Sequence, residues 1–348
     1  MRRTAGTLMD AAINILVIRL KSIGDVVFTL PAVNLVRDAF PKAKITFLTA
    51  EENRPVARCF AGVDNIVALD RKVFRRMGLG AIWSESVGLV LRLRRAKFDL
   101  VIDLQGYGET ALLTWLTRAP QRWGRIYRPA RRWAYTCGLP WSTDRHPVDW
   151  FVSLLRHCGP ICGSTARNQF CLPESAMQAA REFFLTHGLD RAKPTLFIQP
   201  LASSPGKNWP LKNYLALAAH WQALGLQVLF GGGPGDRATL QPALDAGHVA
   251  SAGVPLLTTA GLMRLSTVVL GSDTGLVHLA NAMGQRVVML IHGITPGATF
   301  PYGHPEWTVT PREGHLLPDI AVEDVIAATS RAMTDCGAAG TARETCLP

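Results

Sequence analysis

Residues 13–25 read Ile-Asn-Ile-Leu-Val-Ile-Arg-Leu-Lys-Ser-Ile-Gly-Asp, an apolar run that passes directly into a polar turn. The start of this stretch has the composition of a buried strand. A helical pattern follows from Asp25 to Phe40, where Pro41 is placed to stop the helix. A strand that leads through a short turn into a helix is the opening of a βαβ unit. We therefore expect a parallel α/β sheet with this turn at the carboxyl end of a strand.

The same rhythm recurs along both halves of the chain, which predicts two Rossmann-like units in tandem. In the first half we expect strands at 13–19, 44–48, 65–69 and 98–103, and helices at 25–40, near 54 and at 82–95. In the second half we expect strands at 195–199, 227–230, 268–270 and 286–291, and helices at 211–224, 236–244, 274–283 and 322–333. The stretch 118–150 is basic, aromatic and less regular, so we assign no strand or helix to it.

Chain length and loop composition predict where the domains divide. The 348 residues exceed the size of about 250–300 at which a single core stops growing. A loop-like composition follows residue 158. We expect one domain over 1–165, a second over 166–334 and a poorly ordered tail over 335–348. The last helix belongs to the second domain or packs back on the first, and residues 1–12 suggest no role.

The basic excess of the chain lies entirely in its first half. Residues 1–165 hold 25 Lys and Arg against 13 Asp and Glu, whereas 166–348 hold 12 against 13. This asymmetry indicates either a solvated basic surface or an anionic partner such as a lipid surface or an acidic substrate. Aromatic residues interleave with six arginines over 118–132, but no nucleic-acid-binding signature accompanies them. We favour an acceptor-facing or membrane-facing surface over nucleic acid.

Apolar runs and cysteines restrict the compartment and the cofactors. The longest apolar runs are too short to cross a bilayer, and no cleavable signal peptide is evident at the start of the chain. The seven cysteines are odd in number and scattered, which indicates reduced thiols in the cytoplasm. Cys158 and Cys162 lie near His157, but no second close pair completes four metal ligands. We expect no metal and no cofactor.

Polar residues follow three of the predicted strands, where open α/β sheets bind ligands. Ser22, Gly24 and Asp25 follow the first strand, and Asp25 suits either a helix cap or a site carboxylate. Ser203, Ser204 and Lys207 follow the strand at 195–199 and suit a diphosphate. Asp273, Thr274, Gly275, Leu276 and His278 open a third helix, whose positive end can hold a phosphate. For His278, a ligand role and a structural role both remain open.

The sequence does not match two common nucleotide-binding motifs. The loop with Lys207 lacks the spacing of a Walker A motif. The run Gly231-Gly-Gly-Pro-Gly-Asp236 has an aspartate where a dinucleotide fingerprint needs its last glycine. A hydride-transferring dinucleotide enzyme is therefore disfavoured.

Four ordered motifs together resemble the heptosyltransferases of glycosyltransferase family 9, and the match covers most of the chain. They are residues 15–32 with Lys-Ser-Ile-Gly-Asp25, 98–106 ending in Asp-Leu-Gln-Gly106, Lys207-Asn-Trp-Pro210, and 272–279 with Ser-Asp-Thr-Gly-Leu-Val-His278. The resemblance implies a GT-B fold, in which two Rossmann-like domains face each other across a cleft. It also implies an inverting transferase that moves heptose from ADP-heptose to an anionic, lipid-linked saccharide of the lipopolysaccharide core.

The resemblance also assigns roles to individual residues. It implies that Asp25 is the general base, with Ser22, Gly24 and Gln105 on the acceptor side in the first domain. It places Ser203, Ser204 and Lys207 at the donor diphosphate. The second donor segment that it implies comprises Asp273, Thr274, Gly275, Leu276 and His278. The family's acceptor would place the protein at the cytoplasmic face of the inner membrane, as a peripheral protein.

One departure from the family pattern leaves the acceptor open. Glu109 precedes Thr110-Ala111 where the family often has a basic residue, and a carboxylate there would repel an acidic sugar. Three alternatives remain: the same fold with another donor or polysaccharide acceptor, a nucleotide-sugar epimerase, or a non-catalytic nucleotide-sugar-binding protein. The complete motif around Asp25 argues against the last of these.

Overall fold

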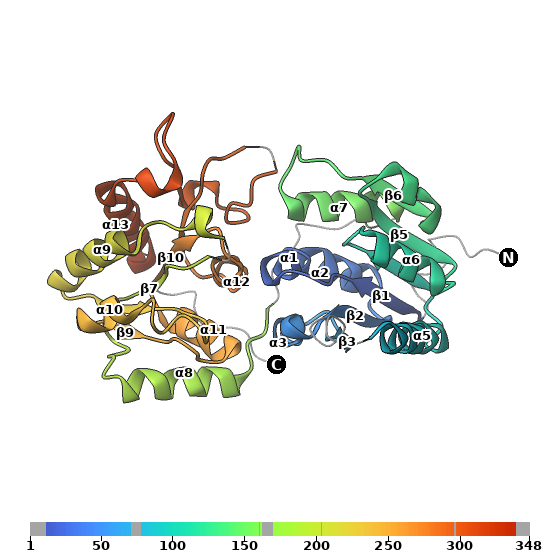
Figure 1. Ribbon diagram of the computed structural model, residues 1–348, viewed down its shortest axis with the longest axis horizontal. Helices are drawn as coiled ribbons and strands as arrows, with labels where there is room; N and C mark the ends of the chain where they lie inside the picture. Colours follow the sequence, from blue (N-terminus) through green and yellow to red (C-terminus); the bar gives the residue numbers. More distant parts are fainter. Residues whose placement is uncertain are drawn as a thin grey trace. The chain divides into compact units, whose positions relative to one another are not determined.

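The computed structural model describes residues 12–70, 78–159, 161, 170–202, 204–295 and 297–338. Its contacts divide the chain into two compact units, residues 1–170 and 171–348. Each unit contains one six-stranded parallel sheet with helices on its faces (Figure 1). Both sheets have the same strand order. With the strands of each unit counted along the chain, that order is 3-2-1-4-5-6, the order typical of dinucleotide-binding folds.

The first sheet has the order β3-β2-β1-β4-β5-β6. Its strands are β1 (Asn14–Ile18), β2 (Lys44–Ala50), β3 (Asn65–Leu69), β4 (Leu100–Asp103), β5 (Gln121–Ile126) and β6 (Cys137–Pro140). Its α-helices are α1 (Ile23–Val27), α2 (Leu30–Ala39), α3 (Arg54–Ala57), α5 (Leu79–Arg95), α6 (Gly108–Leu116) and α7 (Pro147–Cys158). Leu89 and Leu93 of α5 pack on β1 and β4 residues Leu16 and Val101, so this helix covers one face of the sheet.

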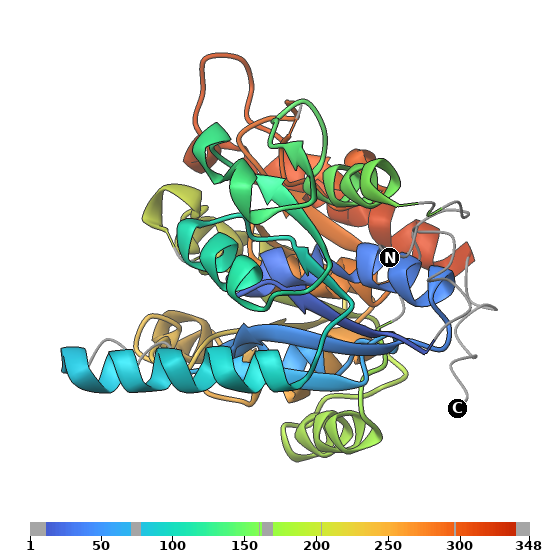
Figure 2. The ribbon, with the colours of Figure 1, turned by 90° about the vertical axis from the view of Figure 1, so that its right-hand side faces the viewer.

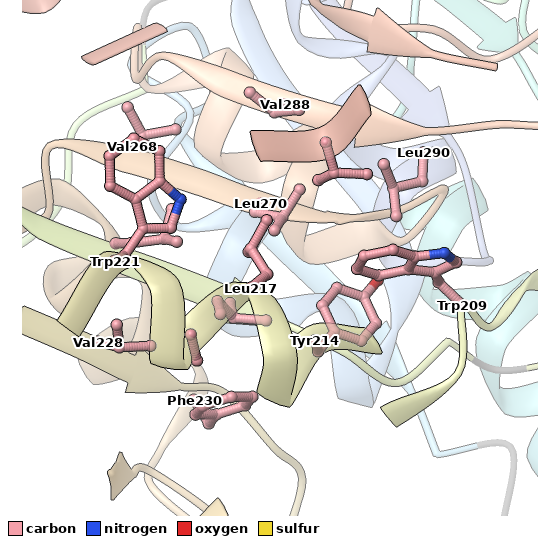
Figure 3. Close-up of a cluster of buried hydrophobic side chains, with 14 of the residues drawn as sticks. Trp209, Tyr214, Leu217, Trp221, Val228, Phe230, Val268, Leu270, Val288 and Leu290 are labelled. Atoms are coloured by element: carbon pink, nitrogen blue, oxygen red, sulfur yellow. The ribbon is translucent and has the colours of Figure 1, made fainter. Parts of the chain in front are cut away.

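The second sheet has the order β12-β11-β10-β7-β8-β9. Its strands are β7 (Thr195–Gln199), β8 (Gln227–Phe230), β9 (Val249–Ala250), β10 (Val268–Ser272), β11 (Val287–Leu290) and β12 (Thr308–Val309). Its α-helices are α8 (Glu174–Thr186), α9 (Leu211–Ala223), α10 (Gln241–Asp245), α11 (Leu256–Leu265), α12 (Gly275–Ala282) and α13 (Val322–Ala338). Figure 3 shows the core between α9 and this sheet, where Trp209, Tyr214 and Trp221 pack against β-strand residues such as Leu270.

The final helix packs within the second unit. Val325 and Ala332 of α13 are buried in the same core as Trp221 of α9, and Trp221 Nε1 donates a 3.1 Å hydrogen bond to Thr329 Oγ1. The helix continues to Ala338, five residues beyond the expected end at Met333. Residues 339–348, which make up most of the expected tail, lie outside the described residues, as do residues 1–11.

Several expected elements were wrong. The single helix expected at 25–40 is two helices, because Pro31 has no N–H with which to continue the hydrogen-bond ladder of α1. The helix expected at 236–244 is confined to α10, because Asp236 Oδ2 instead accepts a hydrogen bond from Gly233 N (2.7 Å) and closes a turn.

The stretch 118–150 is more regular than expected. It contains β5, β6, a 3₁₀ helix η3 (Pro129–Ala134) and the start of α7. Both strands mix charged or small residues with apolar ones, so they lack the continuous apolar run typical of a parallel strand. The helices α6, α8 and α11 also had no counterpart among the expected elements.

Candidate active site

In each unit, the expected site residues follow the two strands at which the strand order reverses. Open α/β sheets bind ligands at this switch point, at the carboxyl ends of the strands. In the first sheet the strands are β1, followed by Ser22 and Asp25, and β4, followed by Gln105. In the second they are β7, followed by Lys207, and β10, followed by Asp273. The topology therefore brings the sequence motifs together in pairs, one pair in each unit.

The Asp25 carboxylate lies in the first turn of α1 and is held at both oxygens. Arg19 Nη2 lies 2.7 Å from Asp25 Oδ1. The backbone N of Ser22 donates to Oδ2 at 3.0 Å, and Ser22 Oγ lies 3.4 Å from the same oxygen. Ser22 is the N-cap residue, and Asp25 thus closes the capping box of α1 and is an ion-pair partner at once. Its side chain nevertheless remains 41% exposed, and a carboxylate has about four lone-pair positions, so it can still accept a proton.

The Gln105 side chain ties the β4 loop to the β1 loop. Gln105 is buried, and its Oε1 accepts hydrogen bonds from the backbone N of Leu20 (3.2 Å) and of Lys21 (3.5 Å). Arg19 Nη1 donates to Leu104 O at 2.6 Å and makes a second connection between the loops. Gln105 therefore shapes the turn that carries Asp25.

Asp103, at the end of β4, holds the turn of Gln105 by hydrogen bonds to its backbone. Its Oδ1 accepts hydrogen bonds from Gln105 N and Gly106 N, each at 2.9 Å, and its Oδ2 accepts one from Tyr135 OH at 2.7 Å. Burial raises the pKa of Asp103 in spite of these bonds. Gly106 has φ +71°, and a Cβ there would lie 2.3 Å from Arg125 O. Only glycine fits this close approach of the motif to β5.

Arg125, at the end of β5, is a buried guanidinium that the sequence did not single out. Its Cζ lies 3.4 Å from the Trp141 ring centroid and 5.2 Å from that of Tyr127. Its Nε is buried without a hydrogen-bond partner, and no ion pair to it occurs among the described residues. Burial, followed by the nearby charge of Arg19, lowers the pKa of Arg125 to about 10. At neutral pH it remains a cation, with free hydrogen-bonding capacity for an anion.

In the second unit, Asp273 joins Lys207 and His278. Lys207 Nζ lies 2.5 Å from Asp273 Oδ2, and His278 Nε2 lies 2.9 Å from Oδ1. Burial alone would raise the pKa of Asp273, but its bonds and charge interactions with His278 and Lys207 hold that pKa well below its usual range. His278 is buried and Lys207 is 45% exposed. The lysine is therefore accessible to solvent, while the buried histidine holds the aspartate.

The N-terminus of α12 adds backbone donors to this cluster. Thr274 caps the helix, and its Oγ1 accepts a hydrogen bond from Val277 N at 3.4 Å. Gly275 and Leu276 form the first turn, so their N–H groups have no partner within the helix. A Cβ on Gly271 would lie 2.7 Å from Gln199 O. The absence of a side chain at Gly271 lets β10 and β7 approach closely beneath the site.

The loop after β7 is fixed at both ends. Ala202 N donates to Asn208 Oδ1 at 2.7 Å, and Trp209 Nε1 donates to Ile320 O at 2.9 Å. Ser204 is exposed between these anchors, and its O accepts a 3.0 Å hydrogen bond from Lys207 N. Ser203 lies outside the described residues. Among the described residues, no group of three or more His, Cys, Asp and Glu side chains could hold a metal ion. Cys162 lies outside the described residues.

Comparison with known proteins identifies the family to which the chain is similar. The sequence model of glycosyltransferase family 9 (heptosyltransferase) matches residues 87–317. Lipopolysaccharide heptosyltransferase 1 of Escherichia coli K12 is 22% identical over 304 residues, which cover 83% of this chain and 91% of that protein.

Solved structures show the same fold. A glycosyl transferase of family 9 from Veillonella parvula superposes with a TM-score of 0.81 at 22% identity and covers 94% of this chain and 99% of its own. Escherichia coli heptosyltransferase WaaC with ADP-2-deoxy-2-fluoro heptose gives 0.74 at 19% identity, with coverage of 92% and 99%.

The two Rossmann-like sheets and these structural neighbours define a GT-B fold, the class predicted from the sequence. The family model extends over both units and includes the Gln105, Lys207 and Asp273 loops. The chain belongs to glycosyltransferase family 9 (heptosyltransferase) and is therefore a glycosyltransferase.

Proposed function

We propose that this protein transfers heptose from ADP-heptose to a saccharide of the lipopolysaccharide core, with inversion at the anomeric carbon and with Asp25 as the general base. The observation that carries this proposal is the Asp25 carboxylate, which is fixed at both oxygens and still 41% exposed. A fixed but accessible carboxylate at the end of a parallel strand is suited to accept a proton from an alcohol.

The proposed reaction is a single displacement. The acceptor oxygen attacks the anomeric carbon while Asp25 takes its proton, and the bond from that carbon to the diphosphate oxygen breaks. No covalent intermediate with the protein is needed, since the acceptor itself is the nucleophile. The acceptor side in this proposal also includes Ser22, Gly24 and Gln105.

The second unit supplies the groups that would hold the donor diphosphate. Lys207 Nζ has three donors, of which Asp273 uses one, and its side chain is 45% exposed. The N–H groups of Gly275 and Leu276 at the start of α12 add positive potential. We assign Ser203 and Ser204, which precede Lys207 in the same loop, to diphosphate binding as well. Asp273, Thr274 and His278 would support the residues that bind the donor. These groups would stabilise the charge that develops on the leaving diphosphate.

The proposed acceptor is anionic, and Arg125 is the residue that supports this proposal. A buried guanidinium without a carboxylate partner is unfavourable unless a ligand supplies the anion. Arg125 is close enough to Asp25 and Arg19 for their charges to affect its pKa. An acidic group of the acceptor could therefore bind beside the hydroxyl that reacts. In this proposal Arg125 supplies the positive charge that is missing at Glu109, where the family often has a basic residue.

The proposed location is the cytoplasmic face of the inner membrane, with peripheral attachment. None of the described helices is long and apolar enough to span a bilayer. Residues 1–165 hold 25 basic and 13 acidic residues, and this excess of positive charge favours binding to an anionic surface.

Donor-dependent thermal stabilisation tests the donor assignment. A ligand at 100 times its dissociation constant adds about 2.7 kcal/mol to the free energy of unfolding. We expect ADP-heptose to raise the melting temperature and UDP-sugars to have no effect. Stabilisation by a UDP-sugar alone would contradict the donor assignment. Conversion of the donor into an isomer in the absence of any acceptor would instead identify an epimerase.

A further inference from the structure

Helix α5 exposes a row of large apolar side chains. Trp83, Val87 and Leu91 are spaced four residues apart and therefore lie on one side of the helix. Trp83 is 73% exposed, and the other two are also exposed. The buried residues Leu89 and Leu93 lie on the side that packs on the sheet. Figure 2 shows α5 in cyan as a long helix at the edge of the first unit. This helix has one apolar side in the core and a second on the surface.

Exposed apolar side chains also occur on α6, which lines a common cavity with α5, and on η3. Leu112 and Trp115 of α6 are exposed, and so is Trp133 of η3, whose ring meets the Trp115 ring edge-on at 5.7 Å. Arg94 Nε donates to Leu116 O at 2.7 Å and fixes α5 to the end of α6. We call the exposed side chains of Trp83, Val87, Leu91, Leu112, Trp115 and Trp133 the α5–α6 face. Several large exposed apolar side chains on neighbouring helices indicate an interaction surface.

A cavity of about 440 Å³ opens between the two helices. Its lining is mostly apolar, with Leu20, Leu69, Leu89, Val90, Leu113 and Leu116, and it also includes Glu109. Leu20 immediately follows Arg19, the residue paired with Asp25, and its backbone N is bonded to Gln105. The cavity therefore begins at the loop that carries the proposed general base. Its volume lies within the range of pockets that bind small ligands, and its mostly apolar lining favours an apolar one.

Basic residues border the α5–α6 face. Arg95 continues the row of Trp83, Val87 and Leu91 by one more turn, and the exposed Arg118 follows the end of α6. Neither arginine forms an ion pair with a described residue. Residues 79–134 hold ten Lys and Arg, among them the buried Arg125, against four Asp and Glu, of which Glu85 and Glu109 are exposed. Apolar side chains, tryptophans and flanking arginines are the combination that binds the interface of an anionic bilayer.

We infer that the α5–α6 face docks on an anionic lipid bilayer by inserting its apolar side chains, and that the cavity between α5 and α6 receives an acyl chain. The charge complementarity selects a membrane over an apolar protein partner. The cavity wall at Leu20 then places the lipid next to the acceptor loop. This rests on the proposed function, which includes peripheral attachment to a membrane, and assigns the surface that makes this attachment. Docking is measured without any sugar, so its failure would leave the transferase proposal standing.

Vesicle sedimentation tests the inference with the full-length protein. The vesicles contain phosphatidylethanolamine with phosphatidylglycerol, at low salt and at about 0.5 M salt, where charge interactions are screened within about 4–5 Å. We expect wild-type binding to weaken at high salt without disappearing, because apolar insertion is not screened. Trp83→Ser/Leu91→Ser/Trp115→Ser should bind about tenfold more weakly or worse and lose the salt-resistant part.

The matched control changes apolar residues of similar exposure elsewhere. Leu185, Leu224 and Leu316 are exposed in the second unit, and their triple serine variant should bind vesicles as the wild type does. The inference would be overturned if the α5–α6 variant bound vesicles as the wild type does, or if the control variant lost as much binding as the α5–α6 variant. So would wild-type binding that disappears at high salt. A dimer that needs these side chains, in a protein that ignores vesicles, would assign the face to a second copy of the chain.

A second measurement does not depend on lost binding. Trp83→Phe/Trp115→Phe/Trp133→Phe keeps the face apolar but removes three of the nine tryptophans. Brominated lipids should quench a fraction of the wild-type tryptophan fluorescence. The phenylalanine variant should still bind vesicles but lose that quenched fraction. Undiminished quenching in this variant would show that another surface meets the lipid.

Discussion

Arg19 Nη2 lies 2.7 Å from Asp25 Oδ1, and this ion pair joins the end of β1 to the first turn of α1. The side chain of Arg19 is only 5% exposed, whereas that of Asp25 is 41% exposed. The buried arginine therefore depends on this carboxylate and on Leu104 O, its other hydrogen-bond acceptor. The carboxylate, by contrast, also faces solvent. A residue proposed for proton transfer thus also supports the local structure.

Substitution of Asp25 should therefore affect stability as well as chemistry. Asp25→Asn keeps an oxygen for Arg19 but removes the charge, so we expect the free energy of unfolding to fall by about 1–2 kcal/mol. The partial exposure of the pair keeps this figure small. Chemical denaturation measures it. The exposed Glu52→Gln should change stability by less than about 0.5 kcal/mol. Equal stability of Asp25→Asn and wild type would show that the ion pair contributes nothing.

Lys207→Ala should weaken ADP-heptose binding by about 1.5–3 kcal/mol, the range for a hydrogen bond to a charged group. Lys207 is the half-exposed cation of the second-unit cluster. Isothermal titration with the donor measures the change. Lys212→Ala removes an exposed lysine of α9 in the same unit and should leave donor affinity unchanged. If both variants bind the donor as the wild type does, Lys207 is not a diphosphate ligand.

The Asp273 cluster predicts a loss of stability in acid. The folded pKa of Asp273 is held below its usual value, so the folded state favours the ionised carboxylate more than the unfolded chain does. The resulting stabilisation is complete above the unfolded pKa of about 3.9 and is lost as the pH falls toward the folded value. The melting temperature of wild type should therefore fall more steeply than that of Asp273→Asn from pH 5 to pH 3. Parallel curves would refute this prediction.

Arg125→Met should separate acceptor binding from folding. The change removes a buried cation with no carboxylate partner, so stability should be unchanged or higher. The KM for an acidic acceptor should rise about 10- to 100-fold, because a charge-assisted hydrogen bond is lost. The exposed Arg58→Gln is the control in the same unit. A destabilised variant with a normal acceptor KM would show that Arg125 serves the fold alone.

The sequence was most informative where strands are continuous apolar runs. Runs such as Ile15–Ile18 and Val287–Leu290 are paired with a strand on each side within parallel sheets, so composition alone indicates them. β5 and β6 are missed because Arg122, Arg125 and Pro140 interrupt their apolar pattern. Their strand conformation depends on pairing, of β5 with β4 and of β6 with β5, and on contacts such as Gly124 against the Tyr135 ring. Such contacts between distant residues leave no local signal.

The candidate site was predicted unevenly for the same reason. Asp25, Lys207 and Asp273 each follow an apolar strand and precede a helix, which is a visible local pattern. Arg19 and Arg125 lie inside or at the end of strands, and their importance comes from burial. An arginine in an apolar run such as Ile15–Arg19 is the one signal that could have identified the partner of Asp25. Arg125 had no comparable signal, since it lies among six arginines over 118–132.

The central claim is that Asp25 removes the proton from the acceptor hydroxyl, and the turnover of Asp25→Asn tests it most directly. Heptose transfer is measured with saturating ADP-heptose and acceptor at a temperature where the variant is folded. Donor titration under the same conditions confirms that the second-unit site is intact. A general base contributes about 10² to 10⁴ in rate, so turnover should fall by that factor while donor affinity is unchanged. Near-normal turnover of the folded variant would contradict the account and leave Asp25 as a helix cap and ion-pair partner.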